Sequence, residues 1–390
     1  MKIGIDAKRI FFNSTGLGNY SRRFYNCLST FAFQQDEIYL YSNRKFSDNK
    51  YCSELNNFDK VELRFPTKWY EKLFGGALWR SYFINKQLRS DKISIFYGVS
   101  NEIPLRPKHS TIVTVAIIHD LIFLKYPELY PALDVIFYKM KVKYACRHAN
   151  FIISASQQTK DDLIDLLKVS PEKITVIHPA CDPIFYEKSD SVSNPTSAAL
   201  SLPKKYLLSL GAITPRKNQL LTVKAFQAIK EHYDLDLVIV GNAVGLGKHY
   251  LKEIKDYIAA SGIEDCVHFL NNVPNHDIPA LYRGAEILIY PSIYEGFGMP
   301  IVESLMCGTP VIATQGGCFE EAGGNAAFYL SSLDEHAIAE KIELILKNPE
   351  LKTEKLESAK EHLAQFKVES ITSSIKDFHN KVAKSFRLIF

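Results

Sequence analysis

The stretch that decides the fold is 285–330, which reads AEILIYPSIYEGFGMPIVESLMCGTPVIATQGGCFEEAGGNAAFYL. The apolar run 287–290 is typical of a strand that is buried on both faces, and a glycine-rich loop follows it at 294–298. A helix is expected to begin at Met299 and to end near Gly308, because glycine favours the end of a helix, and a second apolar run follows. This order predicts a βαβ unit whose loop lies at the carboxyl end of a parallel sheet, where ligands bind.

Two carboxylates lie on either side of this loop, Glu295 within it and Glu303 on the helix. We expect Glu295 to reach toward a ligand. We place Glu303 in the first helical turn, where free N–H groups favour an anion, and a carboxylate there accepts hydrogen bonds from neighbouring hydroxyls such as those of a ribose. On spacing alone, a helix-capping Glu303 and a solvent-facing Glu295 explain the pattern equally well.

The whole string from Glu295 to Val311 has the form E-G-F-G-x-P-x-x-E-x-x-x-x-G-x-P-V. It resembles the signature of the retaining nucleotide-sugar glycosyltransferases of the GT4 type, also called glycosyl transferases group 1. The resemblance covers nearly the whole chain and is strongest at 206–330. It implies the α/β architecture called GT-B, in which two Rossmann-like domains face one another across a cleft and a C-terminal helix crosses back to the first domain.

The length of 390 residues suggests two domains. Residues 189–203, SDSVSNPTSAALSLP, are rich in serine and proline and form the best candidate linker. We therefore predict an acceptor-binding domain at 1–188 and a nucleotide-sugar-binding domain at 204–370. By position in the family, 371–390 is the helix that packs on the first domain.

The overall composition is that of an ordinary soluble globular protein, with 46% hydrophobic and 23% charged residues. A net charge of +4 does not indicate nucleic-acid binding, although it allows contact with an anionic membrane surface. The seven cysteines are scattered without a C-x-x-C spacing, so we expect reduced thiols and no metal site. The chain starts directly in a strand pattern, which predicts no signal peptide and a cytoplasmic location.

One segment, 68–89, mixes aromatic and cationic residues. One interpretation is an amphipathic basic helix that touches the cytoplasmic face of the inner membrane. The other is a helix packed on the sheet, with its cations extending to solvent. We favour the second, because Gly75 and Gly76 interrupt the helical period.

The first strand, 2–7, is followed by a predicted glycine loop at 13–20 and a helix at 21–31. Such a loop approaches a phosphate or sugar closely. The next strand ends without the acidic residue that a nicotinamide site would need. The family resemblance implies that Gly16 and Gly18 lie beside the acceptor and the donor phosphates.

His119 follows the predicted strand 111–118. At that place a histidine can donate a hydrogen bond to a sugar hydroxyl or stabilise developing charge, although a lone histidine is more often structural. His119-Asp120-Leu121 matches a motif of the family. The resemblance therefore implies that His119 contacts the transferred sugar.

The diphosphate of a sugar nucleotide needs cations. Arg216 and Lys217 lie on the loop that follows the strand 206–210, where arginine can pair with two phosphate oxygens and lysine supplies a point charge. The segment 234–236 has the Asp-x-Asp spacing of a metal site but precedes a strand, away from the ligand edge, so we predict no metal. The resemblance implies that Asn272 and Val273 lie under the base.

The resemblance implies transfer of a hexose from a nucleoside diphosphate sugar, with retention of configuration and without a further cofactor. We expect His119, Arg216, Lys217 and Glu295 to act in catalysis and Glu303 to hold the ribose. The backbone around Gly296, Phe297, Gly298, Met299 and Pro300 would contact the donor. The pattern is most similar to bacterial O-antigen and capsule mannosyltransferases, which favours GDP-mannose and a glycan or lipid-linked acceptor. Two alternatives are a non-catalytic sugar-nucleotide or glycan-binding partner and a UDP-sugar epimerase of the same fold.

Overall fold

The computed structural model describes residues 1–45, 51–69, 71–72, 76–105, 110–187 and 202–389. The chain forms two compact units, of which unit 1 comprises 1–180 with 368–390 and unit 2 comprises 181–367. Residues 181–187, which we placed in the first domain, pack with unit 2, where the rings of Phe185 and Tyr282 lie 5.9 Å apart. The predicted linker lies outside the described residues except for its last two.

Unit 1 is built on a parallel seven-stranded sheet in the order β3-β2-β1-β4-β5-β6-β7. The strands are β1 (Lys2–Asp6), β2 (Glu37–Tyr41), β3 (Glu62–Arg64), β4 (Ile95–Gly98), β5 (Val113–Ile118), β6 (Phe151–Ser154) and β7 (Ile174–Val176). The predicted first strand, 2–7, is confirmed to within one residue. Strand β5, which lies inside the sheet between β4 and β6, is buried along its whole length, as its apolar sequence predicts.

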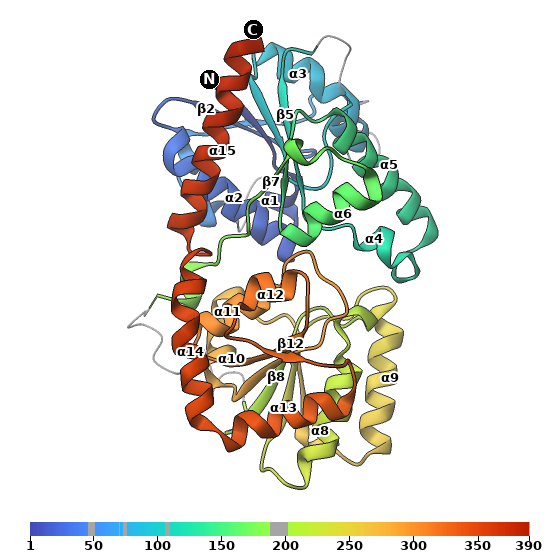
Figure 1. Ribbon diagram of the computed structural model, residues 1–390. Coiled ribbons are helices and arrows are strands. Elements are labelled where there is room, and N and C mark those ends of the chain that lie inside the picture. The colour runs from blue at the N-terminus through green and yellow to red at the C-terminus, as the bar shows by residue number, and fades with distance from the viewer. Residues whose placement is uncertain (46–50, 70, 73–75, 106–109, 188–201, 390) are drawn as a thin grey trace. The chain divides into compact units, whose positions relative to one another are not determined.

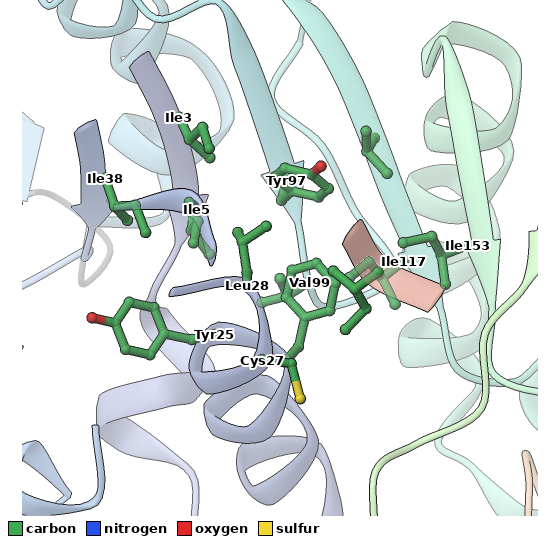
Figure 2. Packing of buried hydrophobic residues seen from close by; sticks show 14 of the residues in the cluster. Ile3, Ile5, Tyr25, Cys27, Leu28, Ile38, Tyr97, Val99, Ile117 and Ile153 are labelled. Atoms are coloured by element: carbon green, nitrogen blue, oxygen red, sulfur yellow. The ribbon is translucent and has the colours of Figure 1, made fainter. Parts of the chain in front are cut away.

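The helices of unit 1 are α1 (Lys8–Phe12), α2 (Gly16–Ala32), α3 (Ile84–Ser90), α4 (Ile122–Lys125), α5 (Ala132–His148), α6 (Gln157–Leu167) and α15 (Val368–Ile389). Side chains of one face of the sheet pack with α2 (Figure 2), and the same core includes side chains of α15. Ile371, Ile375 and Phe378 of α15 belong to this core, so the prediction that the C-terminal helix returns to the first domain is confirmed.

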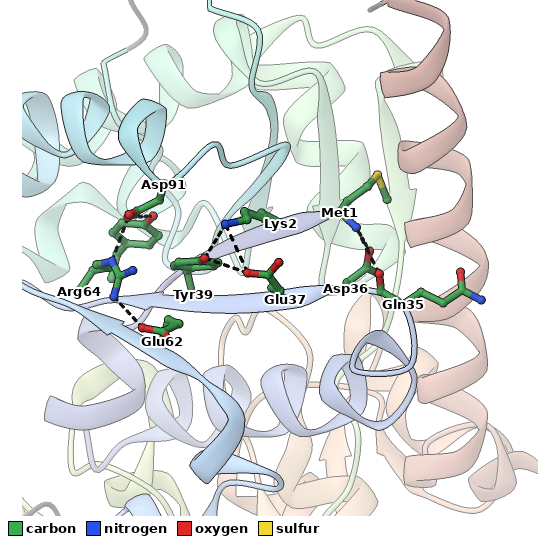
Figure 3. Close-up of polar contacts among 10 residues, drawn as sticks. Met1, Lys2, Gln35, Asp36, Glu37, Tyr39, Glu62, Arg64 and Asp91 are labelled. Carbon is green, nitrogen blue, oxygen red and sulfur yellow. Dashed lines mark hydrogen bonds and ion pairs between the residues drawn. The ribbon is translucent and has the colours of Figure 1, made fainter.

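Charged and polar side chains form contacts along the strands β1 to β3, toward one edge of this sheet (Figure 3). Lys2 donates to the Tyr39 hydroxyl at 2.9 Å. Arg64 lies 2.9 Å from Glu62 and 3.1 Å from Asp91. Glu62 is 59% exposed, so solvent reaches this edge.

Two expectations for unit 1 were wrong. The helix predicted at 21–31 begins at Gly16, so both glycines of the predicted loop lie in the first turn of α2. The segment 68–89 is not one helix, because its described helical part is a π-helical turn at Trp79–Phe83 that continues into α3. Trp79 is buried, as the packed interpretation requires, while the residues 70 and 73–75 lie outside the described part.

Unit 2 contains a parallel six-stranded sheet in the order β10-β9-β8-β11-β12-β13. The strands are β8 (Tyr206–Leu210), β9 (Asp236–Val240), β10 (Val267–Leu270), β11 (Ile287–Tyr290), β12 (Val311–Thr314) and β13 (Phe328–Leu330). The βαβ unit predicted from 285–330 is confirmed as β11, α11 and β12. Strand β11 is fully buried at the centre of the sheet.

The helices of unit 2 are α8 (Gln219–Lys230), α9 (Gly247–Ala260), α10 (Ile278–Gly284), α11 (Met299–Met306), α12 (Cys318–Gly323), α13 (Glu335–Lys347) and α14 (Pro349–Ala364). They cover both faces of the sheet with separate apolar cores (Figure 1). Alternate residues of β8 enter opposite cores, Leu208 on one side and Leu207 on the other. Both units therefore have the Rossmann-like architecture that the sequence predicts.

Candidate functional site

Neighbouring strands of unit 2 bring the predicted cations and the loop carboxylate together. Strand β8 leads into the short 3-10 turn Pro215–Lys217, and β11 leads into the loop that carries Glu295. These two strands are paired in parallel, with Leu208 opposite Leu288. Because their carboxyl ends lie at the same edge of the sheet, the two loops meet there.

Lys217 is held at the centre of this meeting point. Its Nζ lies 2.7 Å from Glu295 Oε1 and donates a hydrogen bond to the Tyr290 hydroxyl at 2.5 Å. The same ammonium lies 4.5 Å from the centre of the Tyr290 ring, at a distance that allows a cation–π contact. Lys217 is therefore fixed by partners that belong to β11 and its loop.

Arg216 approaches the same carboxylate. Its guanidinium forms an ion pair with Glu295 Oε1 and donates to the Tyr294 carbonyl oxygen at 2.6 Å. Ser292 Oγ donates a third hydrogen bond to Glu295 Oε1 at 2.5 Å. The structure thus brings together three of the four residues predicted to be catalytic.

The electrostatics of this cluster follow from burial and from its unequal charges. Burial alone would raise the pKa of Glu295, but Lys217 and Arg216 outweigh it and lower that pKa to about 2. Burial lowers the pKa of Lys217, and Glu295 opposes the change. Two cations share one carboxylate, so the three side chains carry a net charge of +1 at neutral pH. This arrangement suits an anionic ligand.

The loop after Glu295 reaches helix α11 through Gly298, whose φ of +114° favours glycine. The N-cap residue Gly298 has no side chain that could cap α11. Pro300 has no N–H and Ile301 donates to the Gly298 carbonyl oxygen at 2.9 Å, so the Met299 N–H is the candidate donor to an anion at this helix start. Phe297 is buried and lies edge-on to Phe366, at 5.4 Å between ring centres. Gly296, Met299 and Pro300 are the remaining predicted contacts of this loop, and they are half-buried.

Glu303 lies one position beyond the first turn of α11, which corrects our placement of it within that turn. It is half-buried, and the Tyr282 hydroxyl donates to its Oε2 at 3.1 Å. Burial, assisted by Glu303, raises the pKa of Tyr282 well above its ordinary value, so this hydroxyl stays a donor. The Tyr282 side chain on α10 therefore orients Glu303.

The residues predicted to lie under a base are on the loop after β10. Asn272 is exposed and has a left-handed backbone, with φ of +55°. Its side-chain oxygen accepts a hydrogen bond from Asn242 at 3.0 Å. Val273 is half-buried against the core of unit 2.

His119 lies in unit 1, directly after β5, and is buried. Its Nε2 is 2.8 Å from the Val99 carbonyl oxygen, which can only accept, so Nε2 carries a hydrogen. Burial lowers the pKa of His119 to about 4, although the bond to Val99 opposes the change. The imidazole is thus neutral at pH 7 and has Nδ1 as its acceptor. It differs in this respect from the hydrogen-bond donor that we expected.

The predicted glycine loop of unit 1 serves the packing of helix α2. A Cβ atom on Gly18 would lie 1.9 Å from the Asn13 carbonyl oxygen, so this position requires glycine. A Cβ on Gly16 would meet no atom within 4 Å. Tyr20, one turn further along α2, packs edge-on against His119, at 4.5 Å between ring centres.

Sequence reasoning missed the partners that orient the site, namely Tyr282, Tyr290, Ser292 and Cys318. Tyr290 is the last residue of β11, and Ser292 follows two positions later. Because buried polar groups are nearly always hydrogen-bonded, these two polar residues at the end of a buried strand could have predicted polar partners nearby. Cys318 lies on α12 and its Sγ is 3.3 Å from the Glu295 carbonyl oxygen. The sequence contains no local pattern that predicts this contact.

None of the described helices has the length and hydrophobicity needed to span a bilayer. Among the residues that the structure describes, no group of three or more His, Cys, Asp or Glu side chains is arranged to hold a metal ion.

Comparison with known proteins gives matches along most of the chain. Residues 194–362 match the family model described as "Glycosyl transferases group 1", and 30–184 match that of "Glycosyltransferase Family 4". The chain is 26% identical over 350 residues to O-antigen chain mannosyltransferase B of Escherichia coli, which covers 87% of this chain and 89% of that protein. It is 27% identical over 218 residues to O-antigen chain mannosyltransferase RfbU of Salmonella typhimurium, which covers 56% of each.

A solved structure shows the same fold along nearly the whole chain. Anabaena Alr3699/HepE, crystallised with UDP and glucose, superposes with a TM-score of 0.72 and 19% identity over 98% of this chain and 100% of that one. The two family models together account for parts of both units, and each unit has the expected parallel sheet. The chain therefore belongs to the family 4, group 1 glycosyltransferases and has the two-domain GT-B fold.

Proposed function

We propose that this glycosyltransferase moves a hexose from a nucleoside diphosphate sugar to a hydroxyl of a glycan or lipid-linked acceptor in surface polysaccharide synthesis. The proposal includes retention of the anomeric configuration, independence from metal ions and GDP-mannose as the favoured donor. The O-antigen mannosyltransferases among the relatives support the choice of mannose. The crystal structure with UDP and glucose supports a nucleotide-sugar donor and leaves a UDP-linked sugar as the competing candidate.

The observation that carries the proposal is the cluster of Lys217, Arg216 and Glu295, in which Glu295 is buried and the two cations are half-buried. A nucleoside diphosphate carries about two or more negative charges at neutral pH, and it gains charge when its bond to the sugar breaks. Fixed cations in a water-poor site stabilise that charge without having to reorganise. The net charge of +1 and the uncapped start of α11 at the same loop supply the complementary field.

The remaining side chains of unit 2 take positions around this group. Glu295 would bind hydroxyls of the transferred sugar, and Glu303 those of the ribose. The backbone from Gly296 to Pro300 would contact the diphosphate. Asn272 and Val273 would lie against the base, with an exposed amide and an apolar wall as the contacts available.

Unit 1 supplies the groups proposed for the sugar and the acceptor. In its neutral form, His119 would accept a hydrogen bond from a sugar hydroxyl through Nδ1, because Nε2–H is bonded to Val99. Gly16 and Gly18 remain candidates for the approach of the acceptor at the start of α2. These roles are part of the proposal.

The chemical step requires no base from the protein. The bond between the anomeric carbon and the β-phosphate oxygen breaks, and that oxygen takes the electron pair. The acceptor oxygen forms its bond on the same face of the sugar, and its proton passes to the leaving phosphate. Lys217 and Arg216 would stabilise the developing negative charge, which is the largest contribution expected from the protein.

The test compares GDP-mannose, UDP-glucose and ADP-glucose by the nucleoside diphosphate released in the absence of acceptor, together with thermal shifts caused by GDP, UDP and ADP. A ligand at a hundredfold excess over its Kd stabilises the folded state by about 2.7 kcal/mol, so the preferred base is readily identified. We expect GDP to stabilise most and GDP-mannose to be hydrolysed slowly.

The other outcomes each remove a defined part of the proposal. Stabilisation by a nucleotide with neither hydrolysis nor transfer would favour the non-catalytic binding partner. Stronger stabilisation by UDP than by GDP would identify a UDP-linked sugar, and not GDP-mannose, as the donor. Activity that a chelator abolishes and Mg²⁺ restores would contradict metal independence.

A further inference from the structure

Helix α5 lies at the outside of unit 1 (Figure 1). It is apolar on two opposite sides, of which only one packs into the core. Val142, Ala145 and Cys146 point into the buried core with strands β5 and β6. Tyr138 turns toward α4, with its ring centre 5.8 Å from that of Phe123. These contacts fix which side of the helix is the inner one.

The opposite side exposes a stripe of large apolar residues. Leu133 is 69% exposed, Ile136 53%, Phe137 57% and Met140 63%. Their spacing of i, i+3, i+4 and i+7 places all four on one face of the helix. Large apolar side chains that gather on an exposed face mark an interaction surface, whereas single ones are ordinary. We call these four residues the outer stripe.

The charges around the outer stripe indicate what covers it. Lys143 and Arg147 continue the same face, three and seven positions after Met140, and both are exposed. The helix carries four cationic side chains, Lys139, Lys141, Lys143 and Arg147, against the single acid Asp134. Protein–protein interfaces are depleted in lysine at their cores. An apolar stripe that continues into exposed lysine and arginine is typical of helices lying in the interface of an anionic bilayer.

We propose that the outer face of α5 binds the surface of an anionic phospholipid membrane. The outer stripe would enter the boundary between headgroups and acyl chains, and Lys143 and Arg147 would contact lipid phosphates while their aliphatic stems lie along the apolar surface. This locates the membrane contact on α5, whereas our sequence interpretation considered it for 68–89. The proposal does not depend on the donor or on the glycosyl-transfer reaction, because it concerns binding alone.

The test is cosedimentation of the full chain with phosphatidylcholine vesicles, with and without phosphatidylglycerol, at low and high salt. The parent chain is expected to bind the anionic vesicles and to bind them less well at high salt. The double variant Phe137→Ser, Met140→Ser should bind at least about tenfold more weakly. Lys143→Gln, Arg147→Gln should lose roughly 25-fold, which is about fivefold for each cation removed.

A matched control removes exposed apolar side chains elsewhere. Val244 and Leu246 of unit 2 are 71% and 60% exposed, so Val244→Ser, Leu246→Ser should leave vesicle binding unchanged. Circular dichroism is the check on folding, and each variant is expected to be folded because all the substituted side chains are on the surface. A Phe137→Trp variant should also show quenching by brominated lipids beyond that of the parent chain.

Three results would overturn the proposal. The first is vesicle binding by the Phe137→Ser, Met140→Ser variant that equals that of the parent. The second is parent binding that is no stronger with phosphatidylglycerol than without it. The third is a parent dimer, seen by analytical ultracentrifugation, that the same double variant converts to monomer, because the outer stripe would then be covered by a second copy of the chain.

Discussion

Each unit places a group of charges around one buried carboxylate at the end of its inner strands, Asp6 in unit 1 and Glu295 in unit 2, but the two groups are composed differently. In unit 1, Asp6 ends β1, and Arg80 donates to it at 2.9 Å and also pairs with Glu102. Lys141 pairs with Glu102 at 2.9 Å, so two acids meet two cations. In unit 2, two cations meet the single carboxylate of Glu295.

The difference separates a structural network from a candidate ligand site. In unit 1, Glu102 has its pKa lowered to about 2, because Arg80 and Lys141 outweigh the effect of burial. Burial, followed by the charge of Arg80, lowers the pKa of the adjacent Lys8, which disfavours a further positive charge there. Among the described ion pairs, the set in unit 1 is balanced, with two acids and two cations, whereas the set in unit 2 is unbalanced, with one acid and two cations, and its net positive charge suits an anion.

The largest loss of stability is expected when the balanced set of charges in unit 1 loses Arg80. Arg80→Met removes the cation between the buried Asp6 and the half-buried Glu102, and an uncompensated buried charge typically costs about 3–5 kcal/mol. Both tryptophans of the chain, Trp69 and Trp79, belong to unit 1. Urea titrations followed by tryptophan fluorescence therefore measure the free energy of unfolding of this unit.

The matched control for Arg80 is Arg64, which also pairs with two acids but lies at the solvent-reached edge of the sheet (Figure 3). Arg64→Met should cost about 1 kcal/mol or less, because surface ion pairs contribute little. Equal losses for the two variants would show that the Arg80 network is not the buried structural set described above.

The next effect tests the unbalanced set. Lys217→Ala leaves Glu295 paired with Arg216, so the fold of unit 2 should be kept. Under the proposed function, the variant loses a cation that stabilises the leaving diphosphate, which is expected to lower kcat by about 100- to 1,000-fold, or roughly 3–4 kcal/mol. The measurement is single-turnover transfer with saturating donor.

Lys252→Ala is the control for this prediction, because Lys252 is exposed and pairs only along its own helix, with Asp256 among the contacts described. Its kcat should equal that of the parent. Near-normal turnover by Lys217→Ala with donor bound would refute the role of Lys217, although the comparison of charges in the two units would stand.

The smallest effect concerns the neutral histidine of unit 1. The pKa of His119 is about 4 in the folded chain against 6.5 ordinarily, so between these values the unfolded chain binds a proton that the folded chain does not. Stability therefore falls as the pH decreases from 6.5 to 4, and about 2 kcal/mol of it should be lost between pH 7 and pH 5. His119→Asn should remove this part of the pH dependence in the same fluorescence titrations.

His276→Asn serves as the control, because His276 is 79% exposed and lies in unit 2. It should leave the pH dependence of unit 1 unchanged. If the stability of His119→Asn fell between pH 7 and pH 5 as much as that of the parent, His119 would not be the buried neutral group that the structure shows.

Much of the fold could be predicted because its signals are local. The apolar runs of β8, β10 and β11 gave the strand bounds to the residue, and the glycine loop before Met299 marked the start of α11. The start of α2 was missed, because Gly16 and Gly18 have low helix propensity, although Thr15 at the N-cap position is a residue type that favours the start of a helix. Tertiary packing of Gly18 against Asn13 outweighs that propensity.

The sequence by itself determined which side chains follow which strands, and hence that Lys217 and Glu295 belong to a ligand edge, since strand periodicity and loop composition are properties of neighbouring residues. Only the tertiary structure decided that β8 and β11 are adjacent, that Glu295 is shared by two cations, and that His119 donates to Val99. It also decided which apolar side of α5 faces the core. These outcomes depend on contacts between segments far apart in the chain, which no local pattern specifies.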